Sequence, residues 1–311
     1  GTGGAAGTAP ETVIYAGSNW YGHAPVWAGI ETGIFERAGF AVEARAFGGS
    51  TDRVTALEAD AAQFASLGEV AMLAAMSEGR DGFYWIGNQD IAPGAEGLVG
   101  IGIDSIQGLR GKKIAVNLNS SVHITLYELL AGAGLDIHTD VELLKATDSA
   151  VVDLVRAGEA QAGIIWEPFY SDLRALPGAV VLGTDEDTSI YRRFKTMTGP
   201  DMVCASKSWV DADLDRARRF FHAYFRAVEW CRDHPGELQG IIGARVGKEP
   251  AEIEPVLRNF RWLGLADQRV VMSDAMLFGQ AQVASEILRD MRLIERVPDF
   301  RRWTLPDLLT D

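Results

Sequence analysis

The sequence is poor in cysteine, because Cys204 and Cys231 are the only two in 311 residues. They show no metal-ligand spacing and lie on separate predicted elements, so a cysteine-based metal centre and a disulfide-rich scaffold are excluded. We expect two buried free thiols. A single disulfide is the alternative, which an exported protein would allow.

Long apolar runs and positive charge are also scarce. No stretch of about 18 apolar residues occurs, which excludes a membrane-spanning helix. The chain has 29 lysines and arginines against 43 aspartates and glutamates, for a net charge of −14, and no basic run interrupts this excess. Nucleic acid and an anionic membrane are therefore not expected as partners.

Motifs of common enzymes and of DNA-binding regulators are missing too. The chain has no G-x-S-x-G, H-E-x-x-H or G-x-x-x-x-G-K-[ST] pattern. The opening "GTGGAAG" has the glycines of a dinucleotide fingerprint, but no strand precedes it. No helix-turn-helix segment with a basic face is evident. We therefore expect no metal and no cofactor.

What the chain does have is enough apolar sequence for two domains, since 47% of its residues are hydrophobic. It opens on "GTGGAAGTAP", and we predict that residues 1–10 form a flexible tether. This tract is either a simple flexible end or the start of a mature exported chain whose signal has been removed. The acidic run at 184–189 lacks the spacing of a calcium loop and is expected to be a solvated loop.

Strand and helix patterns alternate along most of the chain, which predicts an α/β fold with parallel or mixed sheets. Strands are expected at 12–17, 40–47, 61–68, 83–89, 111–116, 141–146, 161–168, 179–184 and 201–210. Helices are expected between them at 25–39, 50–60, 69–79, 121–134 and 148–158. A helical tail follows at 214–235, 250–260 and 272–294.

Small polar residues crowd into the turn before the helix at 121–134. Ser120 or Ser121 can cap this helix, with Asn119 and His123 beside them. The first turn of a helix also has backbone N–H groups without partners, so a carboxylate, sulfonate or phosphate can bind there. On this stretch alone, plain capping remains the alternative.

Three other strand-to-helix turns are similar. The turn at 47–52 has two glycines before Ser50 or Thr51, which are predicted to cap the next helix; the turn at 66–72 contains Gly68; and the loop at 16–27 carries aromatic residues. Ligands of open α/β sheets bind beyond the carboxyl ends of the strands, so these turns favour one ligand cleft.

These segments resemble a known family, the substrate-binding proteins of ABC importers, in the aliphatic sulfonate, taurine and nitrate branch related to thiamine-precursor-binding proteins. The segments are "GIETGIFERAGFAVEARAFGGS" (29–50), "ALEADAAQFASLGEVAMLAA" (56–75), "GLRGKKIAVNLNSSVHITLYELLAGAGL" (108–135) and "VVDLVRAGEAQAGIIWEPFYSDL" (151–173). In the last, Gln161 replaces the family's usual aspartate. The resemblance covers roughly 12–208.

The resemblance implies a type II periplasmic-binding fold, with two α/β lobes, a C-terminal helical tail and a ligand buried between the lobes by hinge closure. Lobe 1 would comprise 11–102 and 203–311, and lobe 2 would comprise 103–202. Crossover strands would lie near 102–105 and 201–206. The partners implied are a small solute and an ABC permease with its ATPase. The chain would be a monomer, periplasmic or extracellular, with a lipid anchor as an option.

Ligand-binding residues carried over by position come from both lobes. They are Asn19, Trp20, Tyr21, Gly49, Ser50, Gly68, Glu69, Asn119, Ser120, Ser121, His123, Trp166, Glu167 and Asp201. Several residues have alternative roles. His123 can orient neighbouring groups, and Glu69 and Glu167 can complement helix N-termini. His23, near this set, can bind a ligand or satisfy a backbone carbonyl.

The charge of the solute is left open by these residues. Helix N-termini with serines favour an anion, whereas Glu69, Glu167 and Asp201 favour a cation, so an aminosulfonate such as taurine satisfies both. A cationic amine, a guanidinium compound or an aminopyrimidine is the alternative. An enzyme of the thiamine-pyrimidine-synthase type shares this fold, but its cysteine-rich segment is not found here.

Overall fold

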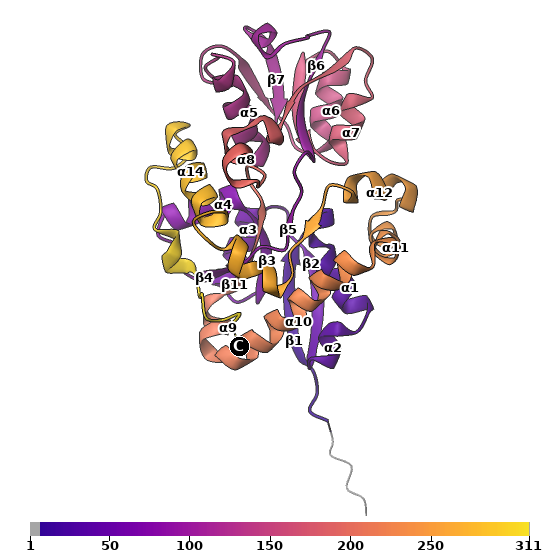
Figure 1. The fold of residues 1–311 in the computed structure, drawn as a ribbon, viewed down its shortest axis with the longest axis vertical. Coiled ribbons are helices and arrows are strands. Elements are labelled where there is room, and N and C mark those ends of the chain that lie inside the picture. The colour runs from indigo at the N-terminus through magenta and orange to yellow at the C-terminus, as the bar shows by residue number, and fades with distance from the viewer. Residues whose placement is uncertain (1–6, 311) are drawn as a thin grey trace, which may run out of the picture.

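The computed structural model describes residues 7–310, so most of the predicted tether at 1–10 lies outside the described residues. The chain forms two five-stranded sheets, each flanked by helices and stacked along the long axis of the molecule (Figure 1). The α/β prediction is confirmed.

The first sheet has the strand order β2-β1-β3-β11-β4. β1 pairs in parallel with β2 and β3, whereas β11 runs antiparallel between β3 and β4. Its strands are β1 (Glu11–Gly17), β2 (Phe40–Ala46), β3 (Phe64–Gly68), β4 (Phe83–Gly87) and β11 (Asp201–Ser206). The helices between them are α1 (Ala24–Glu31), α2 (Ile34–Arg37), α3 (Ser50–Glu58) and α4 (Glu69–Ser77).

The second sheet has the order β10-β6-β9-β7-β8. Its strands are β6 (Glu96–Ile101), β7 (Lys113–Val116), β8 (Glu142–Lys145), β9 (Ala162–Trp166) and β10 (Ala179–Thr184). Its helices are α5 (Ser121–Gly132), α6 (Ser149–Arg156), α7 (Phe169–Arg174) and α8 (Ser189–Phe194). Short 3-10 turns occur at Tyr21–His23, Ile106–Leu109, Asp185–Asp187, Leu265–Asp267 and Phe300–Trp303.

The chain crosses between the sheets at 88–95 and again at 195–200. The predicted first crossover at 102–105 is wrong, because β6 already pairs with β9 and β10 of the second sheet. The predicted second crossover at 201–206 is wrong as well, because β11 pairs with β3 and β4 of the first sheet. Sheet membership therefore moves 96–101 out of the predicted lobe 1, and 201–202 into it. Within the first crossing, β5 (Asp90–Ile91) pairs with β12 (Arg261–Trp262). We keep the two-lobe division, with these limits, as a proposal.

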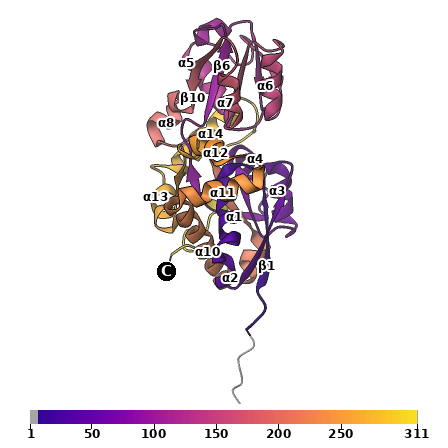
Figure 2. The ribbon, with the colours of Figure 1, turned by 90° about the vertical axis from the view of Figure 1, so that its right-hand side faces the viewer.

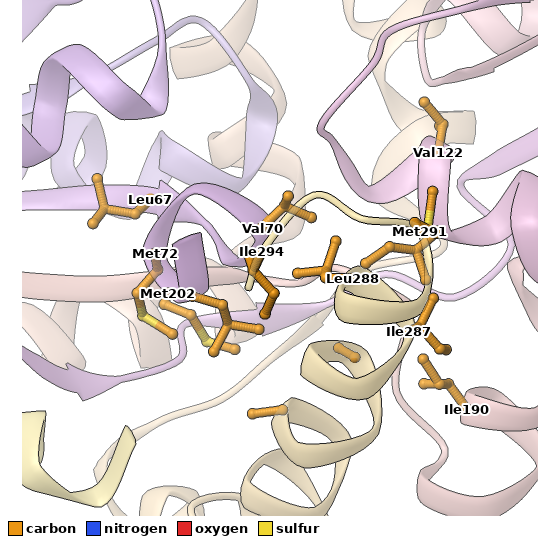
Figure 3. Packing of buried hydrophobic residues seen from close by; sticks show 14 of the residues in the cluster. Leu67, Val70, Met72, Val122, Ile190, Met202, Ile287, Leu288, Met291 and Ile294 are labelled. Atoms are coloured by element: carbon orange, nitrogen blue, oxygen red, sulfur yellow. The ribbon is translucent and has the colours of Figure 1, made fainter. Parts of the chain in front are cut away.

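The C-terminal part is helical, as predicted. It comprises α9 (Lys207–Ala212), α10 (Leu214–Asp233), α11 (Pro235–Val246), α12 (Pro250–Leu257), α13 (Gln268–Val271) and α14 (Leu277–Asp290). α14 contacts α4 of the first lobe and α5 and α8 of the second, and both views show it beside the junction (Figures 1 and 2). Around it, Leu288, Met291 and Ile294 pack in one apolar cluster with Val70 and Val122 from opposite lobes (Figure 3).

Local chemistry explains where elements differ from the predictions. The helix expected at 25–39 breaks at Gly33, whose φ of 74° suits glycine. The strand expected at 201–210 ends at Ser206, because α9 begins at Lys207. Cys204 and Cys231 are free and buried, so the predicted thiols are confirmed. None of the helices within 7–310 is long and apolar enough to span a membrane.

Candidate functional site

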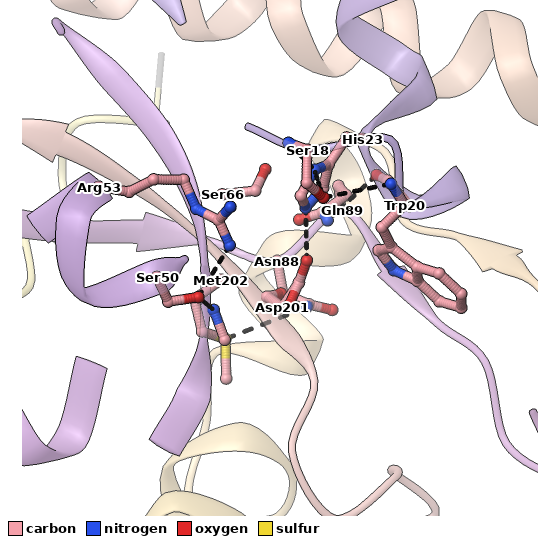
Figure 4. A network of polar contacts seen from close by, with 12 residues as sticks. Ser18, Trp20, His23, Ser50, Arg53, Ser66, Asn88, Gln89, Asp201 and Met202 are labelled. Atoms are coloured by element: carbon pink, nitrogen blue, oxygen red, sulfur yellow. Dashed lines mark hydrogen bonds and ion pairs between the residues drawn. The ribbon is translucent and has the colours of Figure 1, made fainter. Parts of the chain in front are cut away.

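The loop after β1 is joined to the start of β11 through His23. The backbone N–H of Ser18 donates to His23 Nδ1 at 2.9 Å, so Nδ1 is an acceptor. The proton therefore resides on Nε2, which lies 2.6 Å from Asp201 Oδ2 (Figure 4). Burial raises the pKa of Asp201, but the hydrogen bond from His23 and the charge of Arg53 outweigh it and hold the pKa below its usual range.

Ser50 connects the turns after β2 and β3. Its predicted capping role is wrong, because Gly49 is the N-cap of α3 and no side chain caps this helix. Instead, Ser50 Oγ accepts from the Gly68 N–H at 2.9 Å and from the Arg53 guanidinium at 2.8 Å. Asp201 Oδ1 lies 4.0 Å from where a Gly68 Cβ would stand, so these turns meet at one sheet edge.

Glu69 begins α4 at the same edge, but its side chain is turned inward. It is 1% exposed, and Oε1 accepts from Gln280 Nε2 of α14 at 2.7 Å. Gln280 Nε2 also donates to the Thr198 carbonyl at 3.1 Å. Burial raises the pKa of Glu69 to about 8, and its carboxyl group is therefore neutral at pH 7.

Replacing Glu69 by glutamine should flatten the pH dependence of stability. In the wild type, the pKa is about 8 when folded and near 4.5 when unfolded. The folded state therefore holds an extra proton in this window, and stability falls as pH rises, by up to about 1.4 kcal/mol per pH unit. Chemical denaturation from pH 5 to 8 measures this slope. Glu78→Gln, an exposed control next to α4, should keep the wild-type slope; an unchanged slope in E69Q would contradict the assignment.

In the second lobe, Glu96 organises the start of α5. Ser121 Oγ donates to Glu96 Oε2 at 2.8 Å, and Thr125 and Thr198 donate to Oε1 at 2.6 and 2.9 Å. Ser120 is the N-cap, but its hydroxyl donates to the Asn117 carbonyl at 2.6 Å instead of capping. Both serine hydroxyls are thus hydrogen-bonded to the protein itself.

His123 and Asn119 form the outer part of this turn. The Asn119 N–H donates to His123 Nδ1 at 3.1 Å, and Asn119 has a φ of 62°. Burial lowers the pKa of His123 to about 4, so this ring is neutral and orients the turn. Asn119 is exposed.

At the end of β9, Trp166 is half-buried and lies opposite Glu96 in the sheet. Glu167 is 3% exposed and its carboxylate is fully used: it accepts from the Ser171 N–H at 2.9 Å and from Arg174 at 2.8 Å. Glu167 therefore stabilises the start of α7.

The acidic run at 184–189 was predicted to be a solvated loop, and this prediction is wrong in part. Asp185 is buried and accepts a hydrogen bond from the Gly94 N–H at 2.9 Å.

Two adjacent aromatic residues of the first lobe point differently. Trp20 is half-buried and packs on Phe260, with ring centroids 5.4 Å apart. Tyr21 is buried and its hydroxyl lacks a partner among the described residues. Asn19 is exposed. Asn19 and part of Trp20 are thus accessible at the edge of the first sheet, whereas the side chain of Tyr21 is buried.

The second crossing brings the two edges together. Gly199 packs on the first residue of α5: a Cβ there would stand 2.7 Å from Ser121 Cβ and 2.9 Å from its Cα. Asp201, two residues on, belongs to the first edge. The Asp201 edge of the first sheet and the Ser121 edge of the second sheet are therefore the sheet ends that lie next to the crossings. Two surface pockets, of about 340 and 100 Å³, lie elsewhere and include no predicted site residue.

Gly199→Ala should therefore disturb the junction. The clash is with the Cβ and the backbone Cα of Ser121, and we expect a loss of about 1–3 kcal/mol in the free energy of unfolding. Gly236→Ala is the matched control, because a Cβ there meets nothing within 4 Å. Denaturant melts of the two variants give the comparison. Equal stability would show that the crossing segment can shift to accommodate the added Cβ without a cost in stability.

Several residues of this network were not predicted from the sequence, among them Glu96, Thr198 and Gln280. Their partners lie up to 211 positions away in the chain, so no local pattern reveals them. Glu96 follows "APGA" without any motif, and Gln280 lies within an ordinary amphipathic helix.

Comparison with known proteins identifies the family and the fold of the chain. The family model described as NMT1/THI5 like matches residues 20–238. The chain belongs to the NMT1/THI5-like family. A protein of Bacillus subtilis (strain 168) that is named as aliphatic sulfonates-binding is 26% identical over 266 residues, which is 85% of this chain and 76% of that protein.

Solved structures share the fold of this NMT1/THI5-like protein. The periplasmic aliphatic sulphonate binding protein SsuA from Escherichia coli superposes with a TM-score of 0.76 at 19% identity, over 97% of this chain and 100% of that one. The desulfurization enzyme DSZB superposes with a TM-score of 0.70 at 17% identity, over 96% and 97% of the two chains. The predicted periplasmic-binding fold is confirmed, and this fold also occurs in an enzyme.

Proposed function

We propose that this protein is the solute-binding component of an ABC importer and captures a small organic sulfonate between its two lobes. The observation that carries the proposal is Arg53. Its side chain is 6% exposed, it hydrogen-bonds Ser50 Oγ, and its Nε is buried without a partner. Within 7–310, no carboxylate lies within ion-pair distance of this guanidinium.

A buried cation without a paired anion is costly, so an anionic ligand at this edge would supply what the protein lacks. The N-termini of α3 and α5 add donors and a favourable field for an anion. The name of the Bacillus subtilis relative supports a sulfonate as that anion.

The acids that favoured a cationic solute are mostly accounted for by the protein itself. Glu167 is bonded to Arg174 and Ser171, and Glu69 is neutral at pH 7 beside Gln280. Asp201 remains ionised next to His23, with a side chain 19% exposed. This balance favours an anion or a zwitterion over a purely cationic amine or aminopyrimidine.

The state of the two thiols favours a binding role over a catalytic one. Burial raises the pKa of both Cys204 and Cys231, so neither is available as a nucleophile. We therefore propose a monomeric, periplasmic or extracellular protein that delivers its solute to a permease with its ATPase. The curated relative named as a binding protein supports this assignment.

Calorimetric titration tests the proposed solute class. Taurine and alkanesulfonates are expected to bind with a Kd of roughly micromolar or tighter. Nitrate, guanidinium compounds and aminopyrimidines serve as the other arms of the panel. If only uncharged or cationic compounds bind, the sulfonate assignment is wrong; if a bound compound is chemically converted, the binding role is wrong.

A further inference from the structure

The first crossing contains three consecutive residues with orphaned acceptors. Asn88 and Gln89 are 0% exposed and Asp90 is 3% exposed. Asn88 Oδ1, Gln89 Oε1 and Asp90 Oδ1 are all buried without a hydrogen-bond donor among the residues that the structure describes. The segment therefore offers buried acceptor oxygens with no matching donors.

These residues contact the loop that carries Trp20 and His23. Gln89 Nε2 donates to the Gly22 carbonyl at 3.2 Å, and Asn88 Nδ2 donates to the Asp201 carbonyl (Figure 4). Asp90 Oδ1 lies 3.1 Å from where a Gly22 Cβ would stand, and Trp20 Nε1 lies 2.6 Å from the same point. Asp90 is thus placed next to the loop that carries Trp20.

Asp90 differs from the other buried carboxylates of the described chain. Glu96 accepts from three hydroxyl groups, Glu69 from Gln280, and Asp185 from the Gly94 N–H. Asp90 has no such donor and no cation within ion-pair distance among the described residues. Burial, and then the charge of Asp201, raise the pKa of Asp90 well above its usual range. Without a ligand, the carboxyl group of Asp90 lacks a donor. A cationic group bound beside it would supply that donor and, as an opposite charge, would lower the pKa of Asp90 again, so that the carboxylate is ionised in the complex.

We propose that Asp90 is a specificity-determining residue that receives the cationic group of the solute, an ammonium or an amidine-type group. This inference rests on the proposed function. The sulfonate end of a zwitterionic solute binds at Ser50, near Arg53, and the cationic end reaches past Trp20 toward Asp90 and Asp201. Trp20 contributes the face of its ring to the cation.

The test compares two ligands that differ only in this group. Taurine has an ammonium where isethionate, 2-hydroxyethanesulfonate, has a hydroxyl. By calorimetry, the wild-type protein should bind taurine at least about tenfold more tightly than isethionate. Equal binding of the two sulfonates would overturn the role of Asp90 while leaving the proposed function intact. Failure of both sulfonates to bind would instead count against the proposed function.

Asp90→Asn then assigns the preference to this residue. The variant should lose most of the taurine preference, while its isethionate affinity stays within about threefold of the wild type. Asp185→Asn is the matched control, since it alters a buried carboxylate of the second lobe, and should keep the preference. If D90N retains the preference, another group receives the cation and the inference is wrong. Should D90N fail to fold, equal binding of taurine and isethionate by the wild-type protein would still overturn the inference.

Discussion

Replacing Arg53 by methionine is expected to weaken sulfonate binding by at least about 30-fold. Removing one partner of a buried, charge-assisted contact costs about 2–5 kcal/mol, and 1.4 kcal/mol corresponds to tenfold in affinity. Methionine keeps an unbranched stem of similar length, so the loss reports the guanidinium. Calorimetric titration with taurine or an alkanesulfonate measures the change.

Two further variants separate this charge from general effects. Arg80→Met removes a more exposed arginine that pairs with Glu58, and it should leave affinity unchanged. Arg53→Lys keeps the charge but loses the fork geometry, so its affinity should fall between those of the wild type and R53M. An R53M variant that binds sulfonates as tightly as the wild type would remove the observation on which the proposed function depends.

Phe220→Ala is expected to destabilise the first lobe by about 3–5 kcal/mol. Phe220 is 0% exposed and lies at the centre of the aromatic cluster between the first sheet and α10. Its ring centroid lies 4.7 to 5.8 Å from those of its aromatic neighbours, which are Phe35, Phe40, Phe64, Trp209 and Phe221. Truncation would remove these contacts and leave a cavity.

The matched control lies on the same helix. Leu214 begins α10 and is 51% exposed, so Leu214→Ala should change stability by less than about 0.5 kcal/mol. Denaturant melts followed by circular dichroism measure both variants. Equal melts would show that the aromatic cluster is not the main source of stability in this lobe.

Local sequence patterns predicted most of the strands and helices, because each element has the periodicity of its own type. They failed where long-range pairing decides. β6 follows the first crossing with no local sign that it pairs with β9 and β10 instead of the first sheet. The helix at 25–39 was predicted as one element, although Gly33 divides it.

The candidate site shows the same division. The polar turns were found from the sequence, because glycine and serine at strand ends are a local signal. The use of each side chain was not: Ser50 and Ser121 bond to Gly68 and Glu96, which lie 18 and 25 residues away. The partners of Glu69 and Glu167 likewise depend on packing, so carboxylates that seemed free for a cation are already bonded. The ligand contacts of all these residues remain predictions.

Small-angle X-ray scattering with and without a bound sulfonate tests the central claim that one solute joins the two sheet edges by closing the lobes. At a taurine concentration that calorimetry shows to be saturating, the radius of gyration should decrease, and R53M at the same concentration should show no change. A wild-type scattering curve that stays unchanged at saturation would contradict capture by lobe closure.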